Sequence, residues 1–241
     1  MYYLLRIKII LLVSFFVFSK PASAQTEIYR PFHDDLPYYF GLTLGYNSSF
    51  LHQVKSRNFI QSDSILVAEP GASGGIALGL LATGRLSDHF QIRVNPQLII
   101  GGARYFSYTL SAASVQPGEP IFQKKVLPAT IVSFPIHFKF NSDRIDNFRT
   151  YLLFGVKFDT DLSSNSTVRT ATDMIKLKRN DFGLEGGIGF NFFLPFVTIS
   201  PEIKISYGLT DLHQQDPSLK YSNVLGAIQS RMIMFSLHFE D

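Results

Sequence analysis

The sequence predicts an all-β protein, an eight-stranded antiparallel transmembrane β-barrel with short periplasmic turns and long extracellular loops. Three observations lead to this fold class. Apolar residues alternate with small or polar residues through eight segments between Tyr39 and Phe239. The connectors between these segments are alternately long and short, and an export signal precedes them all. This rhythm is typical of outer-membrane barrels, whose strands are joined by short turns on one side and long loops on the other.

The chain begins with a tripartite export signal. Arg6 and Lys8 supply a positive region, an apolar core follows, and Ala24 ends an Ala-x-Ala cleavage site. The apolar core is short for a spanning helix, which needs about 20 residues. We therefore expect a signal peptide at residues 1–24, a periplasmic N-terminal segment at residues 25–38 and the barrel at residues 39–241.

Composition excludes several function classes. Loss of Arg6, Lys8 and Lys20 with the signal lowers the basic residues from 22 to 19, which equals the number of acidic residues. The mature chain is therefore neutral, and its charge gives no indication of nucleic-acid binding. The absence of cysteine excludes disulfides, thiolate metal ligands and thiol nucleophiles.

Each of the eight segments separates its side chains onto two faces, because successive residues of a strand point to opposite sides of the sheet. One face is rich in Phe, Leu and Ile, whereas the other carries glycine and charges of both signs. A soluble sandwich or a lipocalin-like barrel would also alternate, with its apolar face inward. An exposed polar face would hold more Lys and Glu than Gly, so we expect the apolar face to contact lipid. Segments of about 9–11 residues also match a tilted membrane crossing.

In chain order, each predicted strand has an apolar residue at every second position on its lipid-facing side. The eight series start at Phe40, Ile76, Phe90, Phe134, Leu152, Phe182, Val197 and Ile233.

The connectors predict the orientation of the barrel. The long ones cover residues 51–73, 105–131, 161–180 and 210–228, and the short ones cover residues 85–88, 142–149 and 194–195. Four long loops without structure of their own are expected outside the cell, and the tight turns face the periplasm. An even number of strands then places both termini in the periplasm.

Three prolines fall inside predicted strands. Pro96, Pro135 and Pro201 cannot donate to a strand ladder, and a closed barrel has no free edge for them. Because each lies within several residues of a short turn, we expect bulges at the periplasmic end to accommodate them.

Eight charged residues are predicted to point into the barrel. The interior of an eight-stranded barrel is just wide enough for side chains to fill it, and a buried charge is tolerated only when it is paired and hydrogen-bonded. We therefore expect a self-neutralising structural plug, and the alternative is a polar relay or an ion path. Four residues of each sign form the set: Arg93, Lys139, Lys157, Lys204, Asp159, Asp181, Glu185 and Glu202.

No constellation in the sequence indicates an enzyme, a cofactor or a metal site. The glycine-rich stretch at residues 183–189 lies within a strand, whereas a phosphate loop follows a strand and opens a helix. The run His33-Asp34-Asp35 fits a solvated turn better than a cation site. No spacing links the polar loop residues into a nucleophile and a base. These residues are Ser62, Asp63, Ser64, Asp173, His213 and Asp216.

A series of short stretches carries a family resemblance. They are RPF at residues 30–32, LP at 36–37, FGLTLG at 40–45, NFRTYL at 147–152, DFGLEGGIGF at 181–190, LP at 194–195, SPEIK at 200–204, GLTDL at 208–212 and SLHFE at 236–240. Their order and spacing resemble the PorT-like outer-membrane barrels of the Bacteroidetes type.

The PorT-like family is tied to type IX protein secretion and gliding. The resemblance therefore implies a non-enzymatic accessory or assembly component of that system, with other secretion-system proteins as partners. It supplies no catalytic residues. The alternative is a stand-alone structural or surface-binding barrel, and the interior charges argue against a small pore.

The C-terminus resembles an insertion signal. Phe235, Leu237 and Phe239 alternate in the manner of the terminal signal that barrel-insertion machinery reads. We expect that machinery and outer-membrane lipid as partners, with no nucleic acid and no cofactor. We also expect Phe239→Ala to lower the amount of folded barrel, whereas Asp241 is expected to be dispensable.

Overall fold

The computed structural model describes residues 27–56, 65–102, 104–111, 120–164, 175–214 and 225–241, so the export signal predicted for residues 1–24 lies outside the described residues. Within these ranges, no helix is long and apolar enough to cross a membrane. The short 3-10 helix η1 (His33–Asp35) precedes the strands. The strands are β1 (Tyr38–Lys55), β2 (Ile65–Gly71), β3 (Ser73–Arg85), β4 (Phe90–Val94), β5 (Gln97–Gly101), β6 (Arg104–Leu110), β7 (Phe122–Leu127), β8 (Thr130–Asn141), β9 (Phe148–Asp161), β10 (Asn180–Phe193), β11 (Thr198–Gly208) and β12 (Leu225–Glu240).

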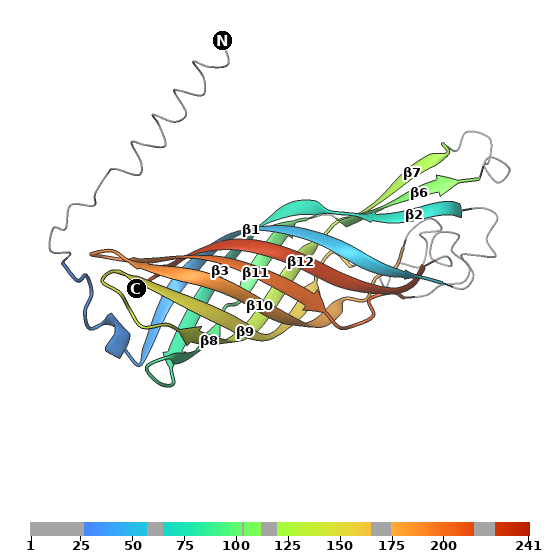
Figure 1. Cartoon of the computed structure of the whole chain (residues 1–241). Coiled ribbons are helices and arrows are strands. Elements are labelled where there is room, and N and C mark those ends of the chain that lie inside the picture. Colours follow the sequence, from blue (N-terminus) through green and yellow to red (C-terminus); the bar gives the residue numbers. More distant parts are fainter. Residues whose placement is uncertain (1–26, 57–64, 103, 112–119, 165–174, 215–224) are drawn as a thin grey trace, which may run out of the picture.

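The strands close into the predicted eight-membered antiparallel ring (Figure 1). The hydrogen-bonded order runs β1-β12-β11-β10-β9-β8 and continues through β4 and β5 to β3, which pairs again with β1. Because β4 and β5 are two halves of one crossing, both pair with β3 and with β8. Closure leaves no free edge in the wall, which is the condition for crossing a bilayer with strands.

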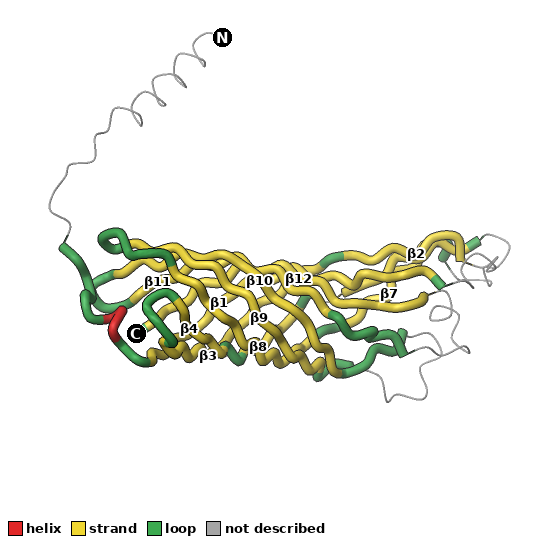
Figure 2. The backbone as a smooth tube through the Cα atoms, turned by 60° about the horizontal axis from the view of Figure 1, so that its bottom comes forward, coloured by secondary structure: helices red, strands yellow, loops and turns green. Residues whose placement is uncertain are grey.

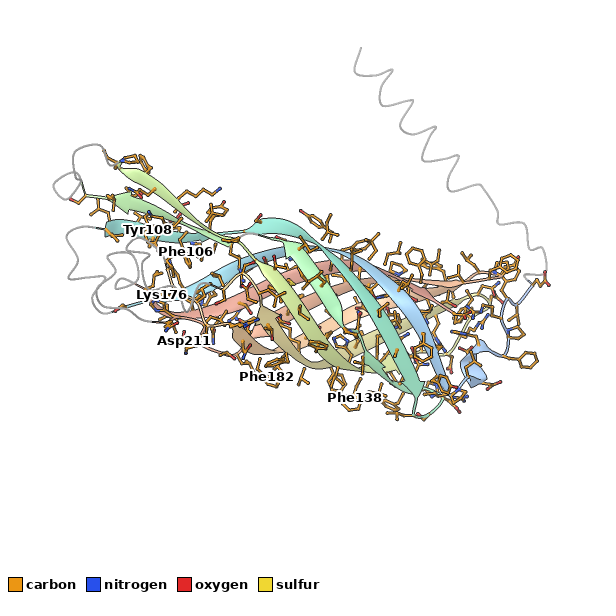
Figure 3. The ribbon with its side chains drawn as sticks, turned by 180° about the vertical axis from the view of Figure 1, so that it is seen from behind. Phe106, Tyr108, Phe138, Lys176, Phe182 and Asp211 are labelled. Carbon is orange, nitrogen blue, oxygen red and sulfur yellow. The ribbon has the colours of Figure 1, made fainter. Side chains whose placement is uncertain are left out.

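The outer surface of this ring is apolar. Phe138 and Phe182 point away from the wall (Figure 3), with exposed fractions of 44% and 46%. Their strand neighbours alternate between exposed apolar and buried polar residues along β8 and β10. A water-soluble barrel would reverse this pattern, so the wall faces lipid, as predicted.

The prolines are accommodated differently from the expectation, because no bulge occurs at any of them. The register of β8 against β9 and of β11 against β12 is unbroken across Pro135 and Pro201. The register of β4, before Pro96, is continued by β5, after Pro96, both against β3 and against β8. Pro96 and Pro135 still accept hydrogen bonds, from the backbone N–H groups of Leu80 and Asn95. Each proline therefore costs ladder bonds rather than register, and the gap at Pro96 divides one crossing into β4 and β5.

The two ends of the barrel differ (Figure 2). The end that holds η1, the C-terminus and the tight turns is called the terminal end, and the opposite end is the loop end. At the loop end, β2, β6 and β7 form a separate three-stranded sheet. The expectation of long connectors without structure is therefore wrong for residues 51–73 and 105–131. β1 and β12 also extend past the ring, and their 18 and 16 residues exceed the expected length.

An apolar core holds the loop-end sheet to the barrel. Phe106 and Tyr108 project from β6, and both are almost fully buried (Figure 3). They belong to a cluster whose other members come from β1, β2, β6, β7, β12 and two connectors. Burial of apolar area contributes about 25 cal/mol per Å², which accounts for strand structure beyond the membrane. The remaining members are Leu51, Ile65, Ala68, Leu110, Leu127, Ile175, Leu177, Leu212, Leu225 and Ile228.

Candidate functional site: the charged interior of the barrel

Strand alternation brings all eight predicted charged residues into the barrel interior. β4 supplies Arg93 and β8 supplies Lys139, while β9, β10 and β11 supply two each. None is more than 6% exposed. Their neighbours on the same strands point to lipid, so a shift of register by one residue would place these charges in the bilayer. The barrel interior therefore holds a large group of buried charged side chains, and we treat it as the candidate functional site.

Arg93 is the centre of the cluster nearest the terminal end. Its guanidinium donates to Glu202 at 2.9 Å and to Glu240 at 2.7 Å. The Tyr151 hydroxyl donates to Glu202 at 2.8 Å, and His238 Nε2 lies 3.4 Å from the same carboxylate. One arginine thus bridges two acids that come from different strands and ties β4, β11 and β12 together across the lumen.

Glu185 organises a second cluster. Lys204 Nζ lies 3.1 Å from its carboxylate, and His137 Nε2 lies 2.7 Å from the same oxygen. The Ser206 hydroxyl donates to the other oxygen at 2.5 Å. Every oxygen of this buried carboxylate therefore has a partner, which is the arrangement that makes a buried charge tolerable.

A third cluster lies toward the loop end. Lys157 donates to Asp159 at 2.6 Å, and Ser133 donates to the second oxygen of Asp159 at 2.5 Å. Asp181 accepts a hydrogen bond from the Ser230 hydroxyl. Arg104 and Asp161 add an ion pair of 2.9 Å beside them.

Four residues of each sign suggest one-to-one pairing, but the eight charges do not pair in this way. Among the described residues, Lys139 has no carboxylate within ion-pair distance; its Nζ lies 4.0 Å from the centre of the Tyr151 ring and 3.5 Å from Asn191 Oδ1. Asp181 likewise has only hydroxyl contact with a described side chain. The expected one-to-one pairing does not occur because Glu240 and two histidines also bind these charges. Glu240 accepts from one of the two terminal nitrogens of the Arg93 guanidinium.

The terminal end is closed by residues 27–37, which we call the terminal strap. Arg149 Nη1 donates to Asp34 at 2.7 Å, and Arg144 lies 3.3 Å from the other oxygen of that carboxylate. Arg144 also stacks on the Phe193 ring at 3.7 Å. Arg30 donates to the Glu240 carbonyl at 3.1 Å. Asp34 is thus held by two arginines, which argues against the cation site considered for this turn.

His33 anchors the strap to the barrel mouth. Its ring lies 4.9 Å from that of Tyr39 and 5.7 Å from that of Phe193, and only 4% of the residue is exposed. Neither ring nitrogen has a hydrogen-bond partner in the described part of the chain. Burial, assisted by the nearby Arg30 charge, lowers the pKa of His33 to about 4. The ring is therefore neutral at neutral pH.

No arrangement of side chains among the described residues suggests catalysis. No group of three or more His, Asp or Glu in those ranges is placed to hold a metal ion. Of the polar loop residues considered from the sequence, His213 bonds the Gly226 carbonyl. The others, Ser62, Asp63, Ser64, Asp173 and Asp216, lie outside the described residues.

Sequence reasoning missed two interior charges that its own rule could have found. Arg149 was assigned to a short connector and Glu240 to the tail after the last strand, yet both are buried. Each continues the inward period-two series of its strand, Arg149 before Tyr151 and Glu240 after His238. The inward series of both strands extends two residues beyond the alternation expected for them, in β9 at its start and in β12 at its end.

A family match agrees with this architecture. The profile of a family described as "Outer membrane protein beta-barrel domain" matches residues 24–214. Among solved structures, the chain is similar to OprG from Pseudomonas aeruginosa, with 16% identity, a TM-score of 0.45, and 84% of this chain and 93% of that chain covered. It is also similar to Ail of Yersinia pestis in complex with the heparin analogue sucrose octasulfate, with 12% identity, a TM-score of 0.39, and 86% of this chain and 100% of that chain covered. For Neisserial surface protein A the identity is 11%, the TM-score is 0.40, and 83% of this chain and 95% of that chain are covered. A search of curated proteins finds no match.

Proposed function

The chain belongs to the outer membrane protein beta-barrel domain family and resides in the outer membrane of a Gram-negative bacterium, and we propose that it is a non-enzymatic barrel that acts on partner proteins through its exposed ends. We assign the interior charges a structural role, as a plug, and we place both termini in the periplasm. Residues 25–38 then form a periplasmic segment before the barrel at residues 39–241, once the signal at residues 1–24 is removed.

The filled interior carries this proposal. Arg93 of β4 reaches Glu202 and Glu240 on the opposite side of the ring, so this cluster crosses the space that a conducting pore would need. Glu185 and Lys204 pair between the neighbouring strands β10 and β11, with both side chains buried in the lumen. The strap adds a second closure at the terminal end through Asp34 and Arg149. Taking one partner from such a buried pair costs several kcal/mol, on the order of 3–5, which favours a permanent plug over an ion path.

Type IX protein secretion is the process that we propose for this barrel. The resemblance to PorT-like barrels supports it, and an interior filled by paired side chains suits an accessory or assembly component. Secretion-system proteins would then be partners, alongside the machinery that inserts the barrel.

Deletion of the gene in its host tests this proposal, with export of type IX cargo and surface gliding as the readouts. The proposal expects both to fail and to be restored by the gene supplied in trans. A deletion strain that exports cargo and glides like its parent would contradict it.

A stand-alone surface-binding barrel is the second candidate. The observation that favours it is the sheet of β2, β6 and β7, which projects beyond the membrane wall (Figure 1). In that case, deletion would leave secretion intact and would remove adhesion to a partner surface.

A further inference from the structure

β7 presents a free strand edge at the loop end. Within the described ranges, β7 pairs with β6 alone, although β8, its continuation, pairs on both sides. The neighbouring strand β9 ends at Asp161, and Ser163 and Ser164 border the same groove as β7 without pairing with it. The separate sheet β2-β6-β7 therefore ends at β7, whose other side has no strand partner among the described residues.

The hydrogen-bonding phase identifies the free backbone groups. The N–H of Leu110 donates to the carbonyl of Ile121 across the start of the β6–β7 pair. Bonded and non-bonded positions alternate along an antiparallel ladder. Phe122, Lys124 and Val126 therefore turn their N–H and C=O groups away from β6, toward the other side of β7.

A groove of about 320 Å³ occupies this position. Its floor is mostly apolar, and the Lys124 side chain lies at its rim, with Nζ 3.8 Å from the centre of the Tyr105 ring. The Asp161 carboxylate also borders the groove, but it is already paired with Arg104 at 2.9 Å. The groove therefore combines the outward backbone groups of β7, a mostly apolar floor and the positive charge of Lys124. The lining includes Lys124, Lys125, Val126, Leu127, Ile175 and Leu177.

From this combination we propose that the groove binds an extended acidic segment of a partner protein, which adds a strand to β7. Backbone pairing would give affinity, and alternate side chains would enter the groove or face solvent. A second copy of the chain fits less well, because antiparallel β7 strands would bring lysines of the same charge together. Lysine at an edge discourages such self-pairing, yet it attracts a segment rich in Glu or Asp.

The inference rests on the proposal that this barrel acts by binding proteins at an exposed end, and it names the class of partner. A direct probe is a fluorescent peptide of alternating Glu and Val, titrated against the full-length protein in detergent micelles. Two peptide controls isolate the chemistry: one carries Lys in place of Glu, and one is N-methylated at every second residue, which removes the hydrogen bonds of one edge.

Two variants at Lys124 separate the contribution of the backbone N–H to peptide binding from that of the side-chain charge. Lys124→Ala keeps the outward N–H and removes the charge, whereas Lys124→Pro removes both and leaves the β6 pairing intact, since that N–H faces away from β6. We expect Lys124→Pro to bind at least about tenfold more weakly than Lys124→Ala, a difference equivalent to one strong hydrogen bond. The N-methylated and Lys-containing peptides are expected to bind the unaltered protein at least about tenfold more weakly than the Glu-Val peptide.

Equal binding of the methylated peptide overturns the inference without reference to any variant. So does equal affinity of the two Lys124 variants, or the absence of saturable binding up to about 1 mM. The outcome is independent of the gene deletion. Failed binding together with lost secretion would leave the proposed function standing, and bound peptide with normal secretion would favour the surface-binding barrel.

Discussion

Two neighbouring glycines of β10 differ in what a single added methyl group would meet. A Cβ at Gly187 would lie 2.4 Å from the backbone oxygen of Ile203, whereas one at Gly186 would meet nothing closer than the Leu153 oxygen at 3.9 Å. We expect Gly187→Ala to lower the free energy of unfolding by about 1–3 kcal/mol, the usual cost of overpacking. Gly186→Ala is the matched control and should be neutral. Urea titration of the folded band on unheated gels measures both, and equal midpoints would contradict the packing described for this strand.

Arg93 tests the energetic role of the interior charges. Arg93→Met keeps the length of the side chain but leaves Glu202 and Glu240 without their shared cation, so we expect a loss of about 3–5 kcal/mol in unfolding free energy. Arg85→Met removes a partly exposed arginine that pairs with the exposed carboxylates of Asp88 and Asp35, and it should change stability little. Thermal unfolding in detergent compares the two. Similar melting temperatures would mean that the interior pairs do not stabilise the barrel.

The terminal strap is an element whose docking depends on pH. His33 has a pKa of about 4 in the folded protein, below its ordinary value of about 6.5, because the ring is buried. The unfolded or undocked strap therefore binds a proton more readily, and the docked state loses stability as pH falls from about 6.5 toward 4. At pH 5 the loss is about 2 kcal/mol, while above pH 7 the contribution is fully present.

A spin label at Ile28→Cys measures this docking, since the chain has no other cysteine. We expect its mobility to rise on acidification from pH 7 to pH 5. His33→Phe, which keeps a ring but cannot be protonated, should abolish the change. A mobility that rises equally in both proteins would assign the effect to other groups.

At the scale of elements, the sequence predicted the membrane crossings well and the loop-end sheet not at all. Period-two alternation is strong wherever lipid and lumen impose opposite demands, as along β8 and β10. β2 lacks it, because its buried residues, Ile65 and Ala68, stand three apart. β2 also contains Pro70 and Gly71, which read as a loop. The tertiary core around Phe106, which includes Ile65 and Ala68, therefore accounts for β2 as a strand.

The partners in the interior were similarly out of reach of the sequence. Alternation gives the inward direction of a residue but not its height in the lumen, which depends on strand stagger. Arg93 and Glu240, 147 positions apart in the chain, meet only because β4 and β12 have a particular tilt across the barrel. Residue direction was therefore predictable, and residue pairing was not.

For the whole molecule, the orientation can be tested with single cysteines. Phe122 at the loop end is 76% exposed and Phe196 in a tight turn at the terminal end is 92% exposed. With both termini in the periplasm, a membrane-impermeant maleimide applied to intact cells should label Phe122→Cys and spare Phe196→Cys. Both should be labelled after the outer membrane is permeabilised. The reverse pattern in intact cells would invert the barrel.

The role proposed for this barrel requires a lumen that is closed by the barrel's own side chains. Current recording across a planar lipid bilayer tests this most directly, with the purified protein shown to be folded by its faster migration on unheated gels. The charge clusters around Arg93 and Glu185, together with the strap, predict a flat trace with no discrete steps at any applied voltage. Reproducible steps that scale with salt concentration would contradict the closed interior and would make the barrel a pore.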